Sequence, residues 1–193
     1  MLALSYLENG HRDHRISLTG KEIMMKDKYL TCMRLIVLTA LSVIMLFIAQ
    51  KHFYESGRLI FFKVQNVKLA DWIEQQYLVG AYVVFITSIT ATILWFFFTS
   101  QKKTNQSSDV EELKKLKSRW LMNWRVLLAI PIIGILIAVF YINKEPHVYF
   151  SLTLCFTFDV ILLYWLPTTT SSLGDLKLTP PGAVFVRSFL GDR

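Results

Sequence analysis

The chain has 193 residues and a formal net charge of +7; hydrophobic residues make up 53% of it and charged residues only 18%. Soluble domains carry about 25% charged residues, so this composition excludes an ordinary soluble domain. The apolar residues gather in four blocks, and each block with its flanks can cross a hydrocarbon core about 30 Å thick. We therefore predict an all-α integral membrane protein with four transmembrane helices, at about residues 31–50, 77–98, 125–143 and 147–166.

The basic residues are distributed unevenly between the segments that flank these blocks. Sixteen of the 21 lysines and arginines lie in the N-terminal segment, the second loop and the tail, and five lie in the first and third loops. The positive-inside rule then predicts that both termini are cytoplasmic, as segments 1–30 and 167–193 on either side of a membrane domain at 31–166. Contact with anionic lipid headgroups accounts for the basic charge, so we expect no nucleic-acid partner. No cleavage motif accompanies the first block, which we interpret as an uncleaved anchor.

Two segments beside the spans have the pattern of short amphipathic interfacial helices. In Lys68–Tyr77, apolar residues recur at helical spacing, which predicts a helix on the outer leaflet that leads into the second span. Ser108 and Glu111 have the spacing of a capping box, so Asp109–Trp120 is predicted to extend the third span on the cytoplasmic side. This helix is expected to rest on anionic headgroups, although a partner helix is the alternative occupant of its apolar face.

The tryptophans, cysteines and histidines, which often serve in functional sites, have simple structural interpretations here. Four tryptophans lie near the predicted cytoplasmic boundary, where indole rings anchor helices at the headgroups: Trp95, Trp120, Trp124 and Trp165. Cys32 and Cys155 are expected at different depths, which argues against a disulfide. His11 and His14 are spaced like metal ligands, but the arginines beside them favour a solvated segment. We therefore predict no metal site and no cofactor.

Asp159 is the one acidic residue of fourteen that lies inside a predicted span. An ionised carboxylate near mid-membrane costs about 2.5–3.5 kcal/mol on insertion scales, so it should face the other helices and find a partner or be protonated. Ser151, Cys155 and Asp159 follow at four-residue steps and share one helix face. Three hypotheses stay open for this face: a structural hydrogen bond to Thr or Ser of span two, a contact with a partner subunit, and a proton or ion site. Arg34 and Arg125, at the cytoplasmic mouth, reach Asp159 only if a span is tilted or displaced.

The C-terminal tail is a second candidate site. Pro180-Pro181-Gly182 forces a turn or an extended backbone, and the residues after it are too apolar for an ordinary soluble terminus. This segment should return to the membrane surface or bind another protein. Its candidate partner-binding residues are Val184, Phe185, Phe189 and Leu190.

The sequence contains no nucleophile with its base, no phosphate-binding loop and no set of metal ligands, so we expect no enzyme. The leading hypothesis is a non-enzymatic accessory or assembly subunit of a multiprotein complex in a bacterial cytoplasmic (inner) membrane, with other membrane proteins as partners. An envelope secretion or conjugation apparatus is one candidate setting. The alternatives are an immunity or exclusion protein embedded in the membrane, and a small transporter or channel that uses Asp159.

Overall fold

The computed structural model describes residues 29, 32–57, 68–100, 110–170 and 180–183, and their regular structure is helical throughout. Within these residues, four helices are long and apolar enough to cross a membrane: Cys32–Ser56, Leu69–Thr99, Ser118–Ile142 and Pro146–Thr170. Helices suit a lipid environment because they satisfy every backbone hydrogen bond internally. The described residues therefore confirm the predicted all-helical architecture and its four helices that are long and apolar enough to cross a membrane.

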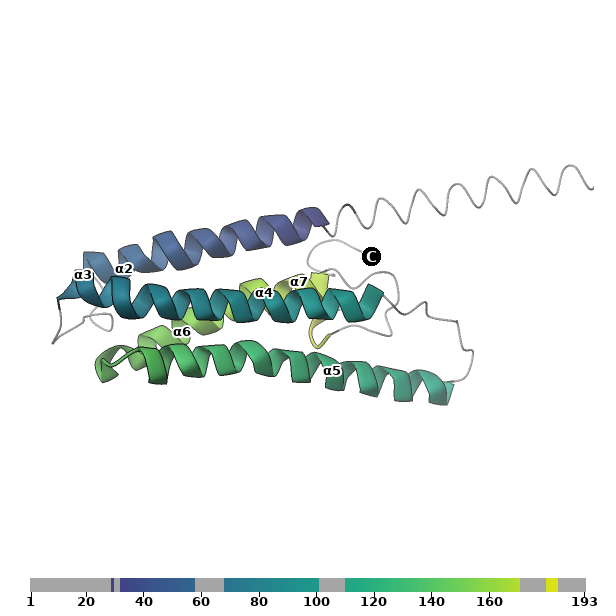
Figure 1. Ribbon diagram of the computed structural model, residues 1–193. Coiled ribbons are helices and arrows are strands. Elements are labelled where there is room, and N and C mark those ends of the chain that lie inside the picture. The colour runs from purple at the N-terminus through teal and green to yellow at the C-terminus, as the bar shows by residue number, and fades with distance from the viewer. Residues whose placement is uncertain (1–28, 30–31, 58–67, 101–109, 171–179, 184–193) are drawn as a thin grey trace, which may run out of the picture.

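The four spans run in alternating directions along one bundle axis (Figure 1). Span one ends in α2 (Gln50–Ser56), span two begins with α3 (Leu69–Trp72) and continues as α4 (Leu78–Ser100), and span three lies in α5 (Val110–Leu136). Span four contains α6 (Tyr149–Val160) and α7 (Leu166–Thr170). We call the end of the bundle that holds Cys32 and Thr170 the termini end, and the end that holds Ser56 and Pro146 the hairpin end.

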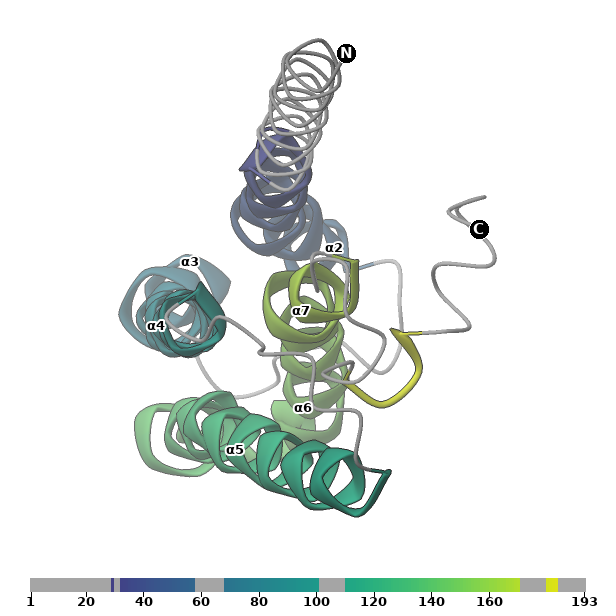
Figure 2. The ribbon, with the colours of Figure 1, turned by 90° about the vertical axis from the view of Figure 1, so that its right-hand side faces the viewer.

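Span one lies at the periphery of the bundle (Figure 2). Only 11% of its most apolar 18-residue window is buried, against 33% for spans two and three and 50% for span four. The side chains of Ile36, Val37 and Ile48 are exposed on it. Span one is therefore less enclosed than the others. Its apolar contacts are concentrated at Leu46, which is fully buried, and at Phe47, which packs against Tyr82 and Phe85 of span two.

Spans one and two extend further than the sequence indicated. Span one continues to Ser56 instead of ending near residue 50, and span two begins at Leu69 instead of near residue 77. The segment 69–77 is one continuous helix with α4, and its Trp72 and Tyr77 are buried among the helices rather than directed at a lipid surface. The hydropathy pattern missed these extensions because they contain polar and aromatic side chains that the bundle interior accommodates.

Small residues let spans two and three approach closely. A Cβ atom on Gly134 would lie 2.3 Å from Thr87 Oγ1, and a Cβ atom on Gly80 would lie 3.3 Å from the Ala138 Cβ. The Thr87 hydroxyl also donates within its own helix, to the carbonyls of Val83 at 2.8 Å and Val84 at 3.1 Å. Glycine at position 134 is therefore required by packing, as is common where membrane helices cross.

Each span contains one π-helical stretch: η1 (Met45–Ala49), η3 (Ile73–Tyr77), η4 (Ile137–Ile142) and η6 (Ile161–Trp165). Such stretches are uncommon and often accompany functional residues. Here a buried polar side chain lies in or within two residues of every one of them: Gln50, Tyr77, Asn143 and Asp159. The irregular turns thus mark the places where polar groups enter the bundle.

A candidate polar site inside the bundle

One face of span one meets one face of span four through polar side chains. Gln50 and Tyr54 are four residues apart on span one, and Ser151, Cys155 and Asp159 are four apart on span four. The two spans are antiparallel, so these steps bring Tyr54 opposite Ser151 and Gln50 opposite Asp159.

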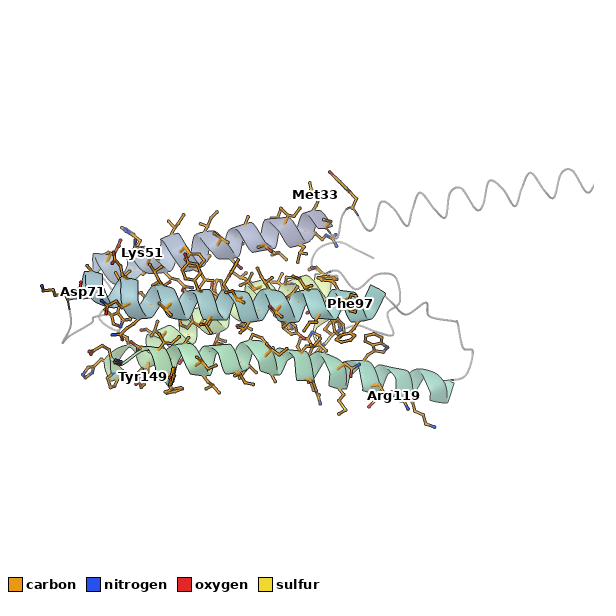
Figure 3. The ribbon with its side chains drawn as sticks, viewed as in Figure 1. Met33, Lys51, Asp71, Phe97, Arg119 and Tyr149 are labelled. Atoms are coloured by element: carbon orange, nitrogen blue, oxygen red, sulfur yellow. The ribbon has the colours of Figure 1, made fainter. Side chains whose placement is uncertain are left out.

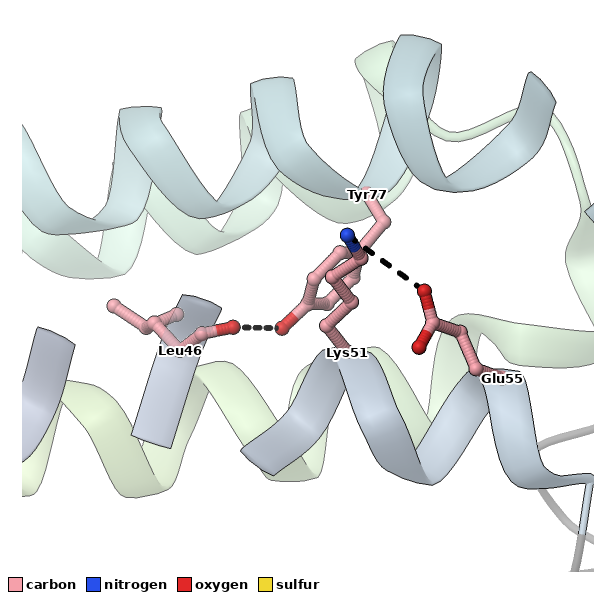
Figure 4. Close-up of polar contacts among 4 residues, drawn as sticks. All are labelled: Leu46, Lys51, Glu55 and Tyr77. Carbon is pink, nitrogen blue, oxygen red and sulfur yellow. Dashed lines mark hydrogen bonds and ion pairs between the residues drawn. The ribbon is translucent and has the colours of Figure 1, made fainter. Parts of the chain in front are cut away.

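The amide of Gln50 is the centre of this arrangement. Its Nε2 donates to Asp159 Oδ2 at 2.7 Å and to the Cys155 carbonyl at 3.5 Å. Its Oε1 accepts from the hydroxyl of Tyr77 at 3.2 Å, and the same hydroxyl donates to the Leu46 carbonyl at 2.5 Å (Figure 4). A single amide therefore connects spans one, two and four.

A second contact lies nearer the hairpin end. The Ser151 hydroxyl donates to the Val148 carbonyl at 3.0 Å, so Tyr54 acts as the donor in its 3.1 Å contact with Ser151. We call the five side chains that form these two contacts the polar network: Gln50, Tyr54, Tyr77, Ser151 and Asp159.

Aromatic rings surround the polar network. The Tyr54 ring centroid lies 5.0 Å from that of Trp72 and 5.3 Å from that of Tyr77, and Tyr77 lies 6.1 Å from Phe156. All four rings are buried. In such surroundings a hydrogen bond has no competing water, and an unpaired polar group is costly.

The structure corrects the expected partner of Asp159. Its side chain bonds to Gln50 of span one, not to a threonine or serine of span two. Thr92 of span two instead donates to the Leu163 carbonyl at 2.6 Å. The shared face of Ser151, Cys155 and Asp159 is as predicted, and span one covers it.

Neither candidate arginine bonds to Asp159. Arg34 donates to the Thr170 carbonyl at 3.2 Å, at the termini end, and the side chain of Arg125 is exposed. Asp159 has none of its surface exposed, and its Oδ1 has no hydrogen-bond partner. Within the described residues, the hydroxyls of Ser42 and Ser88 are also buried without a hydrogen-bond partner.

Polar contacts also close the hairpin end. Trp72 Nε1 donates to Asn143 Oδ1 at 2.8 Å, and Asn143 Nδ2 donates to the Glu145 carbonyl at 3.0 Å. The backbone N–H of Lys144 donates to Gln76 Oε1 at 2.8 Å. The extended start of span two therefore fixes the short turn between spans three and four. Lys51, Asp71 and Tyr149 lie towards this end in Figure 3, whereas Met33, Phe97 and Arg119 lie towards the other.

At the termini end the tryptophans are packed between helices instead of lying at the surface. Trp95 and Trp120 form an edge-to-face pair with centroids 5.7 Å apart, and both are buried. Trp124 donates to Thr168 Oγ1 at 3.1 Å, and its own carbonyl accepts from Tyr164 at 2.7 Å. Interfacial anchoring therefore describes these three rings less well than a role in joining spans two, three and four.

The fourth tryptophan holds part of the tail. Trp165 Nε1 donates to the Pro181 carbonyl at 3.1 Å. Gly182 has φ +84°, and a Cβ atom there would lie 2.9 Å from the Trp165 ring. Ala183 is buried. The predicted turn after Pro180 therefore returns to the bundle, whereas the four candidate partner-binding residues, Val184, Phe185, Phe189 and Leu190, lie outside the described residues.

Sequence reasoning missed three members of the polar network, namely Gln50, Tyr54 and Tyr77. Gln50 and Tyr77 are the last and first residues of the predicted spans one and two, and Tyr54 lies in the part of span one that was assigned to the first loop. A signal was present, because Gln50 and Tyr54 are four residues apart at the end of a block whose other polar side chains are only Thr39 and Ser42. Both cysteines are free, and no group of three potential metal ligands occurs in the part of the chain that the structure describes. His11 and His14 lie outside it.

Comparisons with protein-family models, with curated proteins and with solved structures found no match to this chain.

Proposed function

We propose that this chain is a non-enzymatic accessory or assembly subunit of a multiprotein membrane complex, and that its C-terminal tail is the element that binds a partner. The observation that carries the proposal is the docked turn at residues 180–183. Trp165 holds this turn at a fixed place on the bundle, through the Pro181 carbonyl and the close contact with Gly182. The strongly apolar residues that follow therefore begin at a defined position beside the termini end.

The polar network is consistent with a structural role inside such a subunit. Its side chains join spans one, two and four to one another, and span one has the smallest buried share of the four spans. Hydrogen bonds between membrane helices contribute about 0.6 kcal/mol on average and up to about 1.7 kcal/mol. The resulting fixed arrangement of spans would present the flanking segments to partners.

The proposed setting is the cytoplasmic membrane of a bacterium, with an envelope secretion or conjugation apparatus as the candidate complex. The proposed partners are other membrane proteins and anionic lipid headgroups. Among the described residues near the termini end, the exposed basic side chains Lys115, Arg119 and Arg125 support the lipid contact.

Co-purification in mild detergent tests the proposal. The full chain should retain stable partners, and a chain that lacks Gly182–Arg193 should lose them while remaining inserted as four spans, because helices in lipid satisfy their own backbone hydrogen bonds. Replacing Phe185 and Phe189 together by Asp should reproduce the loss. Each fully buried side chain of this size contributes about 1.5–3 kcal/mol, so two such losses would remove most of a modest binding energy.

The matched control replaces the same two residues by Leu, which preserves apolar character at both positions. Partner recovery from this variant should remain near that of the unmodified chain. Recovery of the same partners from the Asp variant and from the truncated chain would contradict the proposed role of the tail.

A further inference from the structure

Among the described residues, no cationic side chain contacts the Asp159 carboxyl group. The described polar side chains near it are Gln50 from span one, Tyr77 from span two and Cys155 from its own helix. The described part of span three has Arg119 and Arg125 as its nearest cations, and both are exposed. An ionised carboxylate here would be buried without a counter-charge, which is the costliest state for such a group in a bilayer.

The hydrogen-bond donors around the carboxyl group are too few for an ionised form. Gln50 Nε2 donates to Oδ2, and no described group donates to Oδ1. A carboxylate accepts at both oxygens, whereas a protonated carboxyl group accepts at one and donates from the other. Oδ2 has one donor and Oδ1 has no partner, so the described residues do not supply the second donor that a carboxylate requires.

Span two contains a second buried polar atom that has no hydrogen-bond partner. Thr92 of span two contacts the Leu163 carbonyl of span four, and these two spans run in the same direction. Ser88 lies four residues before Thr92 on span two, and Asp159 lies four residues before Leu163 on span four, so both are displaced towards the hairpin end. The Ser88 hydroxyl is fully buried and, like Asp159 Oδ1, has no partner. Two orphaned polar atoms thus occur at corresponding positions on two packed helices.

We propose that Asp159 binds a proton on Oδ1 and forms an intramembrane proton-binding site. The Ser88 hydroxyl does not bond to Asp159 in the structure, and we propose it as the acceptor that the O–H group reaches once the carboxyl is protonated. The proton comes from water, and its release returns it to water, so the step needs no other reactant. The neutral carboxyl group retains the hydrogen bond from Gln50 and removes the need for a counter-charge. This site is independent of the partner-binding role proposed for the tail.

Infrared spectroscopy of the protein in hydrated lipid bilayers at neutral pH tests the proposal. Protein labelled with carbon-13 at the aspartate side-chain carboxyl should show a protonated C=O band that shifts when water is exchanged for deuterium oxide. Asp159→Asn should remove this band. The proposal would be overturned if the labelled protein lacked the protonated C=O band and Asp159→Asn instead lost carboxylate bands, because Asp159 would then be ionised.

Two further variants test the assigned geometry and do not require Asp159 to be altered. Gln50→Leu should move the band to higher frequency, because the C=O oxygen loses its donor. Ser88→Ala should also shift the band, because the carboxyl O–H loses its acceptor. Thr153→Ala is the matched control, since this exposed hydroxyl of span four donates only to the Tyr149 carbonyl, at 2.8 Å, and its loss should leave the band in place. An unshifted band in Ser88→Ala would remove Ser88 from the site.

Discussion

Gln50 and Asp159, which are 109 residues apart in the sequence, are joined by a 2.7 Å hydrogen bond in the interior of the bundle. Gln50 is 2% exposed and Asp159 is fully buried, so water does not compete for this contact. Because span one has the smallest buried share of the four spans, this bond and the neighbouring contact between Tyr54 and Ser151 are central to its attachment. Substitutions of Asp159 should therefore affect the insertion of span one and its attachment to the bundle before any other property.

Asp159→Asn should preserve expression, insertion and the attachment of span one. Asparagine has nearly the same size and keeps an oxygen that accepts from Gln50. Asp159→Lys should reduce insertion or stability, since it places a cation beside the donating amide at an insertion cost of about 2.5–3.5 kcal/mol. Asp159→Leu removes the acceptor and should cost about 0.6–2 kcal/mol.

The yield of membrane-inserted protein and its thermal stability in mild detergent measure these effects. Asp159→Lys behaving like the unmodified chain would contradict the buried, paired position of the carboxyl group. Retention of activity in Asp159→Leu would exclude both a functional partner contact and a proton-dependent activity at this position.

The sequence predicts the four spans well because lipid imposes a simple requirement, a run of apolar residues about 20 long in helical form. It predicts their ends poorly. Gln50 and Trp72 look like loop or interface residues to a hydropathy pattern, yet both are buried because other helices supply their hydrogen-bond partners, Asp159 and Asn143. Such partners belong to tertiary packing, and no single segment contains both members of a pair.

The candidate site was predicted in part for the same reason. The burial of Asp159 follows from its place in an apolar block, and the shared face with Ser151 follows from helical spacing. The identity of the partner depends on the rotation of span one about its axis, which an almost uniformly aliphatic helix does not specify.

Gly134→Ala should destabilise the bundle by about 1–3 kcal/mol, the usual cost of overpacking. The added Cβ atom would lie 2.3 Å from Thr87 Oγ1, and that hydroxyl is held by the Val83 and Val84 carbonyls. Unfolding in a graded mixture of mild and denaturing detergent measures the loss. Adding Thr87→Ala should restore part of the stability, because it removes the atom in closest contact. Equal stability of the single and double variants would argue against this contact as the cause.

Gly182→Ala should release the turn at residues 180–183 from Trp165. The φ of +84° is unfavourable for alanine, and the new Cβ atom would lie 2.9 Å from the indole ring. Cleavage of the tail by trypsin after Lys177 and Arg187 should then become several times faster in the folded protein. Gly57→Ala is the control, since Gly57 also has a positive φ, +58°, but has nothing within 4 Å of its added Cβ atom. Equal cleavage rates in the two variants would show that the Trp165 contact does not hold the turn.

The orientation of the bundle in the membrane is the last prediction, and it rests on the distribution of charge. Because the four spans alternate in direction, the start of span one and the end of span four lie at the same end of the bundle. The 16 basic residues in the N-terminal segment, second loop and tail, against five in the other two loops, predict that this end faces the cytoplasm.

Reporters active only in the cytoplasm should therefore work when fused after Ser107 or Arg193, and reporters active only after export should work when fused after Val64. In a eukaryotic membrane, the Asn105-Gln106-Ser107 sequon should stay unglycosylated, because glycosylation occurs on the opposite side. An exported reporter signal at Ser107 would reverse the assignment. It would also place the apolar tail, and any partner that the tail binds, outside the cytoplasm.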